Sequence, residues 1–462
     1  MTTDLTPITI GSLRPRLLGQ PFPGTEIPAI SQALLEAEQW IEQGRVSAEG
    51  RSWWQAWPDQ PDFEASYGTL SLNTGVAGVI WYLDQALRHQ PGGPTADARR
   101  TRIEEGLAHL AAHWHDETGN YYALPFAATG FYGGLAGIGA VLAQLAHRYP
   151  LAAELAPQVL DAVLDRRDEA GVRWSTTSTM LGDGGVIVSL LTAAHELGED
   201  RYLEAAVRAG DDILSEEVPQ AVGSAWPGVD PQILGMPADV VLEGFETGST
   251  GVAYVLAQLA GATGEQRFIT ATDRALAHIN TLALTHGDGA LLPGYGGKYS
   301  FGYCTGSSGM IRAYVAGHRA TGNPDHLEWA ARYGRGILRS GVPTRTTPGH
   351  QYLLHQCCGS AAIVESFTGL HLETGEPLWL EAARAQADDL LIRSVADDRG
   401  RRWYSEAYRL PPGQLKAEVG HQVGASGIAL ALLHLLQVEE GPGAIVRLPD
   451  DPFHDRSTPR PS

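Results

Sequence analysis

The three cysteines of this chain, Cys304, Cys357 and Cys358, are the residues whose types and spacing best suit chemistry at one site. Adjacent cysteines rarely bridge each other, so we do not expect a disulfide framework. Three thiolates without a fourth protein ligand are typical of a zinc site with an open position, which is the catalytic pattern. Sulfur ligands also disfavour magnesium, calcium and manganese. The sequence therefore predicts zinc on these thiolates, with His355 as an alternative fourth ligand.

An internal repeat indicates the elements that must position these cysteines. A four-residue box of small residues precedes a helix-like apolar run seven times. The first residues of successive boxes lie 59, 48, 66, 58, 53 and 65 residues apart, each about the length of two helices with their loops. This regular spacing predicts a repeat of helix pairs. The boxes are Gly75–Gly78, Gly134–Gly137, Gly182–Gly185, Gly248–Gly251, Gly306–Gly309, Gly359–Ala362 and Gly424–Gly427.

A second set of glycines supports the same repeat. Gly198, Gly264, Gly322 and Gly375 each follow the first glycine of their box by 16 residues. A glycine at this distance suits a helix C-terminus, where a positive φ closes the last turn. The helices that open with the boxes are mostly apolar, whereas the segments between them alternate charged and apolar residues at helical spacing. One set of helices is therefore expected to be buried and the other half-exposed.

These patterns predict an all-α fold, an α/α toroid of seven outer–inner helix pairs. The first outer helix is expected over residues 26–43, and the box glycines bring the N-terminal ends of the inner helices close around a central axis. An open solenoid of helix pairs is the alternative, but it requires polar capping repeats, which the sequence lacks.

The toroid gives the cysteines a common location. Cys304 lies two residues before the fifth box, and Cys358 lies immediately before the sixth box with Cys357 beside it. Adjacent inner helices begin at the same end of the axis, so the three thiols should converge there. Chance burial of separate cysteines is the alternative interpretation. Positive partial charge at helix N-termini would help to hold the ligands as thiolates.

Composition limits the remaining possibilities. No linker divides the 462 residues, so we expect one domain over 26–440, an N-terminal extension over 1–25 and a Pro-rich tail over 441–462. The formal charge of −20 would repel a phosphate backbone and predicts no nucleic-acid partner. No run of about 18 apolar residues appears, so no membrane partner is expected. The N-terminus lacks a secretory pattern, which predicts a cytoplasmic protein with reduced thiols.

With these motifs in place, the sequence resembles the LanC family of lanthionine cyclases and LanC-like proteins over about residues 60–440. The resemblance rests on the seven boxes, on Gly302-Tyr-Cys-Thr-Gly306 and on Cys357-Cys-Gly359. In the usual family pattern the last element is Cys-His-Gly, so Cys358 stands where the family has histidine. Some family members carry the Cys-Cys-Gly variant, which keeps a metal ligand at that position.

The resemblance implies an activity. The family closes thioether rings by adding cysteine thiols of a precursor peptide to dehydroalanine or dehydrobutyrine. Its zinc ion binds the incoming thiol and lowers the pKa of that thiol, and the resulting enolate must be protonated at the α-carbon. The expected partners are a dehydrated precursor peptide and separate dehydrating enzymes, because the chain contains no kinase, lyase or dehydratase motif.

The chain departs from the family in its proton-transfer groups. Where the family commonly has an aspartate, a histidine and an arginine, this sequence has Ser178, Thr247 and Ser300. Substitutes must come from residues near the mouth of the ring. The candidates for catalytic residues are Glu246, Tyr303 and His421, of which Glu246 and Tyr303 are preferred, and Lys298 and Asp183 are further possibilities.

Three other functions are compatible with the pattern. LanC-like relatives suggest addition of glutathione to dehydrated residues. A non-catalytic, peptide-binding scaffold with structural zinc would explain the absent family residues. A carbohydrate-active toroid would need two carboxylates across the ring and would leave the three cysteines without a role.

Overall fold

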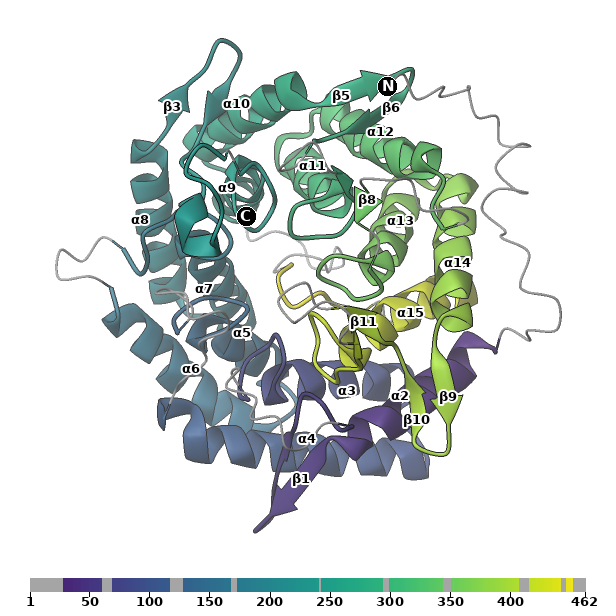
Figure 1. Cartoon of the computed structure of the whole chain (residues 1–462). Helices are drawn as coiled ribbons and strands as arrows, with labels where there is room; N and C mark the ends of the chain where they lie inside the picture. The colour runs from purple at the N-terminus through teal and green to yellow at the C-terminus, as the bar shows by residue number, and fades with distance from the viewer. Residues whose placement is uncertain are drawn as a thin grey trace.

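The computed structural model describes residues 28–59, 69–116, 128–167, 173–240, 242–293, 299–343, 350–351, 353–406, 415–441 and 446–451. Within these residues, fourteen α-helices form two concentric rings (Figure 1). This confirms the predicted α/α toroid. The N-terminal extension over 1–25 lies outside the described residues.

Seven inner helices surround the central axis (Figure 1). The first glycine of every box is the N-cap of an inner helix, as the repeat predicted. These helices are almost entirely buried; every residue of α5, for example, is inaccessible to solvent or nearly so. They are α3 (Val76–His89), α5 (Leu135–Leu145), α7 (Asp183–Leu197), α9 (Ser249–Thr263), α11 (Ser307–Thr321), α13 (Ser360–Thr374) and α15 (Ala425–Glu440).

Seven outer helices cover this ring, and each buries one face only. The first outer helix ends at Gln43, as predicted, but it begins at Ile30 and not at residue 26, because the described residues 28 and 29 are not helical. Each of the other six packs chiefly on the inner helix that precedes it in the chain. They are α2 (Ile30–Gln43), α4 (Pro94–His113), α6 (Pro150–Asp165), α8 (Asp200–Ser215), α10 (Gln266–Leu282), α12 (Pro324–Ser340) and α14 (Pro377–Ile392).

The ring closes between the two ends of the chain. Each inner helix contacts the next one in the chain, and the last, α15, contacts both α3 and the outer helix α2. The hairpin after α14 also reaches α2, where Arg401 pairs with Glu36 at 2.7 Å. A closed ring, rather than an open solenoid, is therefore the architecture, and α2 completes the helix pair of α15.

Short strands lie in the connections between helices. Five pairs are antiparallel, and one pair, β7 with β8, is parallel. Single 3₁₀ turns, η1 (Trp114–Asp116) and η3 (Pro231–Leu234), complete the described elements. The strands are β1 (Arg45–Ala48), β2 (Arg51–Trp54), β3 (Val218–Pro219), β4 (Ser224–Ala225), β5 (Leu284–His286), β6 (Gly289–Leu291), β7 (Tyr299–Ser300), β8 (His350–Gln351), β9 (Val395–Asp397), β10 (Gly400–Arg402), β11 (Ser405–Glu406) and β12 (Leu415–Lys416).

The glycine at the end of a box is required by close packing of the chain on itself. A Cβ atom on Gly251 would lie 1.8 Å from the carbonyl oxygen of Phe245, in the loop that leads into the box. Gly427 has the same relation to His421, at 1.7 Å. The later glycines end inner helices in the left-handed conformation, with φ of +69° at Gly198 and +72° at Gly322, as predicted.

Part of the C-terminal tail lies inside the ring. The sequence placed residues after Gly441 outside the toroid, but Val446, Leu448 and Asp450 are buried. Five consecutive inner helices, α3 to α11, each supply a polar side chain to the segment over residues 446–451. These contacts are Gln85 with the amide of Arg447 (3.1 Å), Gln144 with the carbonyl of Pro449 (3.2 Å), Glu196 with Arg447 (2.6 Å), Tyr254 with the carbonyl of Asp450 (2.6 Å) and Arg312 with Asp450 (2.6 Å).

Two physical reasons explain why this segment was misplaced. It is short and rich in proline and charge, which are the features of an exposed tail. Its polar groups nevertheless find hydrogen-bond partners, such as those of Arg447, Pro449 and Asp450 given above, because the inner helices carry matching polar side chains. The domain boundaries proposed from the sequence otherwise remain a prediction.

Candidate metal centre

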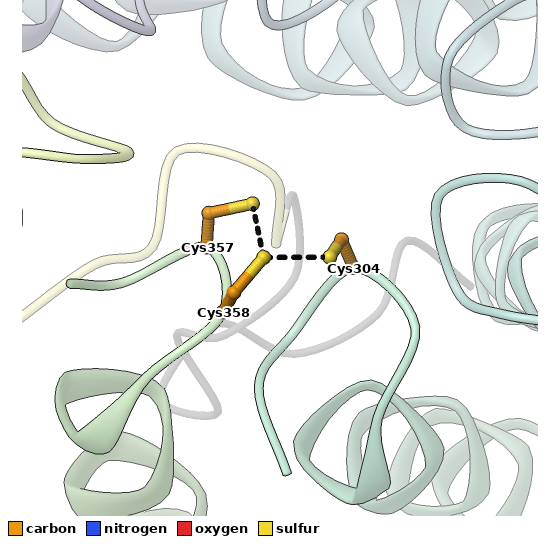
Figure 2. A group of neighbouring side chains, drawn as sticks. All are labelled: Cys304, Cys357 and Cys358. Atoms are coloured by element: carbon orange, nitrogen blue, oxygen red, sulfur yellow. Dashed lines mark hydrogen bonds between the residues drawn. The ribbon is translucent and has the colours of Figure 1, made fainter. Parts of the chain in front are cut away.

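The three cysteine thiols meet at one end of the central axis. The Sγ atom of Cys358 lies 3.0 Å from that of Cys304 and 3.2 Å from that of Cys357 (Figure 2). All three sulfur atoms lie within 4.8 Å of one another, so one metal ion could contact all of them. Cys304 comes from the turn before α11, and the other two come from the turn before α13 (Figure 2). The convergence predicted from the repeat is thus present in the fold.

Backbone hydrogen bonds hold these two turns together. The amides of Tyr303 and Cys304 both donate to the carbonyl oxygen of Cys357, at 2.7 and 3.1 Å. The amide of Cys357 in turn donates to the carbonyl oxygen of Gln422 at 2.8 Å. The backbone positions from which Cys304 and Cys357 project their thiols are therefore fixed by main-chain hydrogen bonds.

The same bonding continues around the axis and links all seven box loops. Six amide-to-carbonyl bonds of 2.8 to 3.1 Å connect one loop to the next. Most of the linked residues stand two positions before the first glycine of their box, so they are equivalent in the repeat. In order around the ring they are Leu181, Glu246, Cys304, Cys357, Gln422, Asn73 and Tyr132. We call this set the collar.

Cys357 and Cys358 act on Cys304 as hydrogen-bonding neighbours. Their thiols lower the pKa of Cys304 well below its usual value, although burial opposes this. His355 is buried, and burial lowers the pKa of its imidazole to about 4, so the ring is neutral. Its Nδ1 accepts a hydrogen bond from the amide of Cys358 at 3.3 Å. Within the described part of the chain, the group of possible metal ligands contains the three thiols and not His355.

Glu246 is the collar residue next to Cys304, and the charges of both Cys304 and Asp450 act on its carboxyl group. Its amide donates to the carbonyl oxygen of Cys304 at 2.9 Å. Burial raises the pKa of its carboxyl group well above the usual value, and negative charge on Cys304 and on Asp450 raises the pKa further. Solvent still reaches part of the residue. The position therefore combines a carboxyl group of raised pKa with a backbone contact to Cys304.

Tyr303 points its hydroxyl group at the C-terminal segment. That hydroxyl donates to the Oδ2 atom of Asp450 and lies 2.5 Å from the hydroxyl of Tyr132, which also donates to Oδ2 at 3.1 Å. Burial raises the pKa of Tyr303 well above its usual value, and the charge of Asp450 adds to the effect. Both phenols are therefore neutral and share one carboxylate.

His421 is buried in the loop before the seventh box. Burial lowers the pKa of its imidazole to about 4, and its Nδ1 has no hydrogen-bond partner within the described structure. The Oδ1 atom of Asn73 and the Oε1 atom of Gln422, both in collar residues, also lack a partner there. All three atoms are buried polar groups without a hydrogen-bond partner in the described structure.

The remaining sequence candidates are Asp183 and Lys298. Asp183 accepts hydrogen bonds from Ser175 (2.8 Å), from the amide of Trp174 (3.2 Å) and from Arg173 (3.1 Å), so its carboxylate is occupied by the structure around it. Lys298 lies outside the described residues. Ser178, which stands where the family has aspartate, donates to Glu216 at 2.5 Å.

Sequence reasoning missed three residues of this centre. Tyr132 carried a signal, because it holds the same position before its box as Cys304 and Cys357 hold before theirs. Arg312 and Asp450 carried none. Arg312 is one of two arginines of α11, the other being Arg319, and Asp450 reaches the axis only because the tail folds back into the ring.

The fold and the thiol cluster together define an α/α toroid with three cysteine thiols at one end of its axis that could hold a metal ion. The model of a family described as lanthionine synthetase C-like protein matches residues 66–445. The chain therefore belongs to the lanthionine synthetase C-like family, as its sequence motifs indicated.

Solved structures agree with this fold. Nisin cyclase superposes with a TM-score of 0.59 at 14% identity, covering 80% of this chain and 90% of that protein. A sugar epimerase from a ruminal bacterium gives a TM-score of 0.45 at 12% identity, covering 90% and 99%. None of the curated protein sequences matches this chain significantly. No helix in the described structure is both long enough and apolar enough to cross a membrane.

Proposed function

We propose that this protein is a zinc-dependent lanthipeptide cyclase, which adds cysteine thiols of a dehydrated peptide to dehydroalanine or dehydrobutyrine. The observation that carries the proposal is the convergence of three thiols at one end of the toroid axis. Membership of the lanthionine synthetase C-like family and the likeness to nisin cyclase support it.

The chemistry of the donor set fits zinc. Cys304, Cys357 and Cys358 would hold the ion and leave one position for an incoming thiol. When bound, zinc lowers the pKa of that thiol, so that it is a thiolate near neutral pH. Each of the three protein ligands is a soft sulfur donor, which disfavours magnesium, calcium and manganese.

Residues of this chain would donate the proton that the α-carbon of the substrate takes up. Addition of the peptide thiolate to the β-carbon leaves an enolate, and the α-carbon then takes up one proton. Glu246 and Tyr303 are the proposed donors, because burial raises the pKa of both side chains and both are adjacent to Cys304 through the chain or a backbone bond. His421 is neutral and buried, and we propose it as a contact for the substrate peptide.

The proposed partners follow from this reaction. The substrate is a peptide whose serine or threonine residues have already been dehydrated, and separate enzymes must supply it. We further propose that the protein works in the cytoplasm, where its thiols stay reduced.

The test uses purified, zinc-loaded protein and a synthetic peptide containing one dehydroalanine and one cysteine. Cyclisation does not change the peptide mass, so alkylation followed by mass spectrometry reports the loss of the free thiol. We expect rapid loss with the wild type and none above background with Cys304→Ala.

Two other outcomes of the same experiment would each support a different function. Turnover that requires added glutathione and increases the peptide mass by one glutathione would indicate addition to damaged proteins. Peptide binding with bound zinc but no turnover on any dehydrated peptide would indicate a scaffold.

A further inference from the structure

Asp450 is the one acidic residue of the C-terminal segment with contacts to both sides of the axis. Its Oδ1 atom accepts from Arg312 of α11 at 2.6 Å, and its Oδ2 atom accepts from the hydroxyl groups of Tyr132 and Tyr303. The side chain is 4% exposed. A buried carboxylate is tolerated here because the guanidinium of Arg312 balances its charge and both oxygens are hydrogen-bonded.

Two tyrosines donate hydrogen bonds to Asp450. One is a collar residue, and the other precedes a collar residue in the chain. Tyr132 is the collar residue of the second repeat, and Tyr303 directly precedes Cys304. The ring of Phe245, next to Glu246 in the chain, packs on the ring of Tyr303 with centroids 4.6 Å apart. The guanidinium of Arg312 lies 5.1 Å from the centroid of the same tyrosine ring. Asp450 is thus joined to the metal centre through side chains that have little freedom to move.

We propose that Asp450 is a positioning residue for the thioether addition, holding the hydroxyl groups of Tyr132 and Tyr303 in one arrangement beside the metal centre. The inference rests on the proposed cyclase function and names a residue that only the folded tail brings to the site. Asp450 acts through the two tyrosines and does not itself touch the substrate.

The chemistry gives this positioning a measurable consequence. The sulfur of the peptide thiolate forms a bond to the β-carbon, the π electron pair moves into the enolate, and the α-carbon gains one proton. The thiol proton was lost before the addition, so the reaction is balanced without any oxidant or reductant. The enolate is planar, and the face that receives the proton decides the configuration of the α-carbon. A hydroxyl fixed on one side therefore gives one product epimer.

The experiment compares two full-length variants of neighbouring residues. Asp450→Asn keeps the shape of the side chain but removes its charge and one acceptor oxygen. Asp451→Asn is the matched control, because Asp451 is the neighbouring acidic residue and pairs with Arg319 at 3.3 Å. Zinc content should be the same in both variants. For Asp450→Asn we expect kcat to fall by about 10-fold or more with KM changed less than about 3-fold, and the product to become a mixture of epimers.

A spectroscopic readout does not depend on activity. In metal-free protein, loss of the carboxylate acceptor should shift the near-ultraviolet absorption of the buried tyrosines in Asp450→Asn but not in Asp451→Asn. If Asp450→Asn fails to fold, Tyr132→Phe tests the same arrangement. This variant removes one hydroxyl and retains the contact between Asp450 and Arg312, and it should also yield mixed epimers.

The outcomes separate this inference from the proposed function. An active wild type whose Asp450→Asn variant keeps its rate and a single epimer would overturn the role of Asp450 alone. A zinc-loaded wild type that never cyclises dehydrated peptides would overturn the proposed function, and this role of Asp450 with it.

Discussion

At the scale of the residue, the seven repeats differ in the type of side chain at the collar position. The same backbone position carries a carboxamide in the first and seventh repeats, a phenol in the second, a carboxyl group in the fourth and thiols in the fifth and sixth. Because main-chain hydrogen bonds fix every one of these positions, side-chain identity can change without disturbing the frame. Cys358 is the exception, since it supplies its thiol from the next residue along the chain.

Cys358 provides a test of the metal centre at this scale. Cys358→Ala removes one of three proposed protein ligands, so zinc affinity should fall by about 10-fold or more, and cyclisation with it. Cys358→His should retain about one zinc per chain, because imidazole is also a good zinc ligand. Elemental analysis of dialysed protein measures both. If Cys358→Ala kept full zinc and activity, the third ligand would be reassigned to His355.

Glu365, on the axis side of α13, predicts a pH dependence of stability. Burial raises the pKa of its carboxyl group to about 7, above the ordinary value of 4.5. A raised folded-state pKa means that the stabilisation is complete below pH 4.5 and is lost as the pH rises through 7. Glu365→Gln should therefore gain about 2 to 3 kcal/mol relative to the wild type between pH 5 and pH 8.

Urea unfolding of the two proteins at both pH values gives this difference directly. Comparing variant with wild type at each pH cancels the contribution of Glu418, whose pKa is also raised to about 7 by burial. An equal difference in stability at pH 5 and pH 8 would contradict the assignment.

At the scale of the element, the start of each inner helix depends on close approach between the box and the loop before it. In α9, Gly251 has no space for a Cβ, whereas a Cβ on Gly261 of the same helix would meet nothing within 4 Å. The two glycines therefore serve different purposes. Gly251 permits packing at the collar, and Gly261 only lowers the helix propensity of its turn.

This contrast predicts opposite effects for one substitution. Gly251→Ala should destabilise the protein by about 3 kcal/mol, because the new methyl group would displace the loop that carries Glu246. Gly261→Ala should stabilise it by up to about 1 kcal/mol through helix propensity. Thermal unfolding of both variants is the measurement. Similar effects of the two substitutions would show that the clash at Gly251 is relieved elsewhere.

At the scale of the whole molecule, the first described helix, α2, packs on the last, α15, and the two form the seventh outer–inner pair. The closed ring leaves no terminal repeat with an uncovered face, which an open solenoid would need to cap. Trp40 of α2 is fully buried where the ends meet, and the guanidinium of Arg402 lies 5.0 Å from its ring centroid. The Trp40 side chain thus joins α2 to the β9–β10 hairpin, which precedes α15 in the chain.

Closure predicts how a defect at this junction spreads. Trp40→Ala should cost about 3 to 5 kcal/mol and accelerate hydrogen exchange in all seven inner helices, because they open together. Leu35→Ala is the control, since Leu35 lies in the same helix but is 39% exposed, and it should change stability by less than about 0.5 kcal/mol. Faster exchange confined to α2 and α15 would show that the ring opens locally at the junction.

The sequence alone determined the repeat, the helix boundaries and the convergence of the thiols. These features have local causes: small residues where chains approach closely, glycines that end helices, and apolar periodicity along each helix. Because the repeat places equivalent residues at equivalent points around an axis, Cys304 and Cys357 could be brought together without knowledge of any tertiary contact. Glu246 was a candidate for another reason, because it lies next to Thr247, where the family commonly has histidine.

Only the tertiary structure decided what faces the thiols from within the ring. Asp450 comes from a short tail without periodicity, and its contacts with Tyr132, Tyr303 and Arg312 join segments separated by between 138 and 318 residues. No local pattern encodes such contacts, because each depends on the ring having closed and on the tail having entered it. A buried carboxylate is stable there only when its partners are already in place, so its position is a property of the folded molecule.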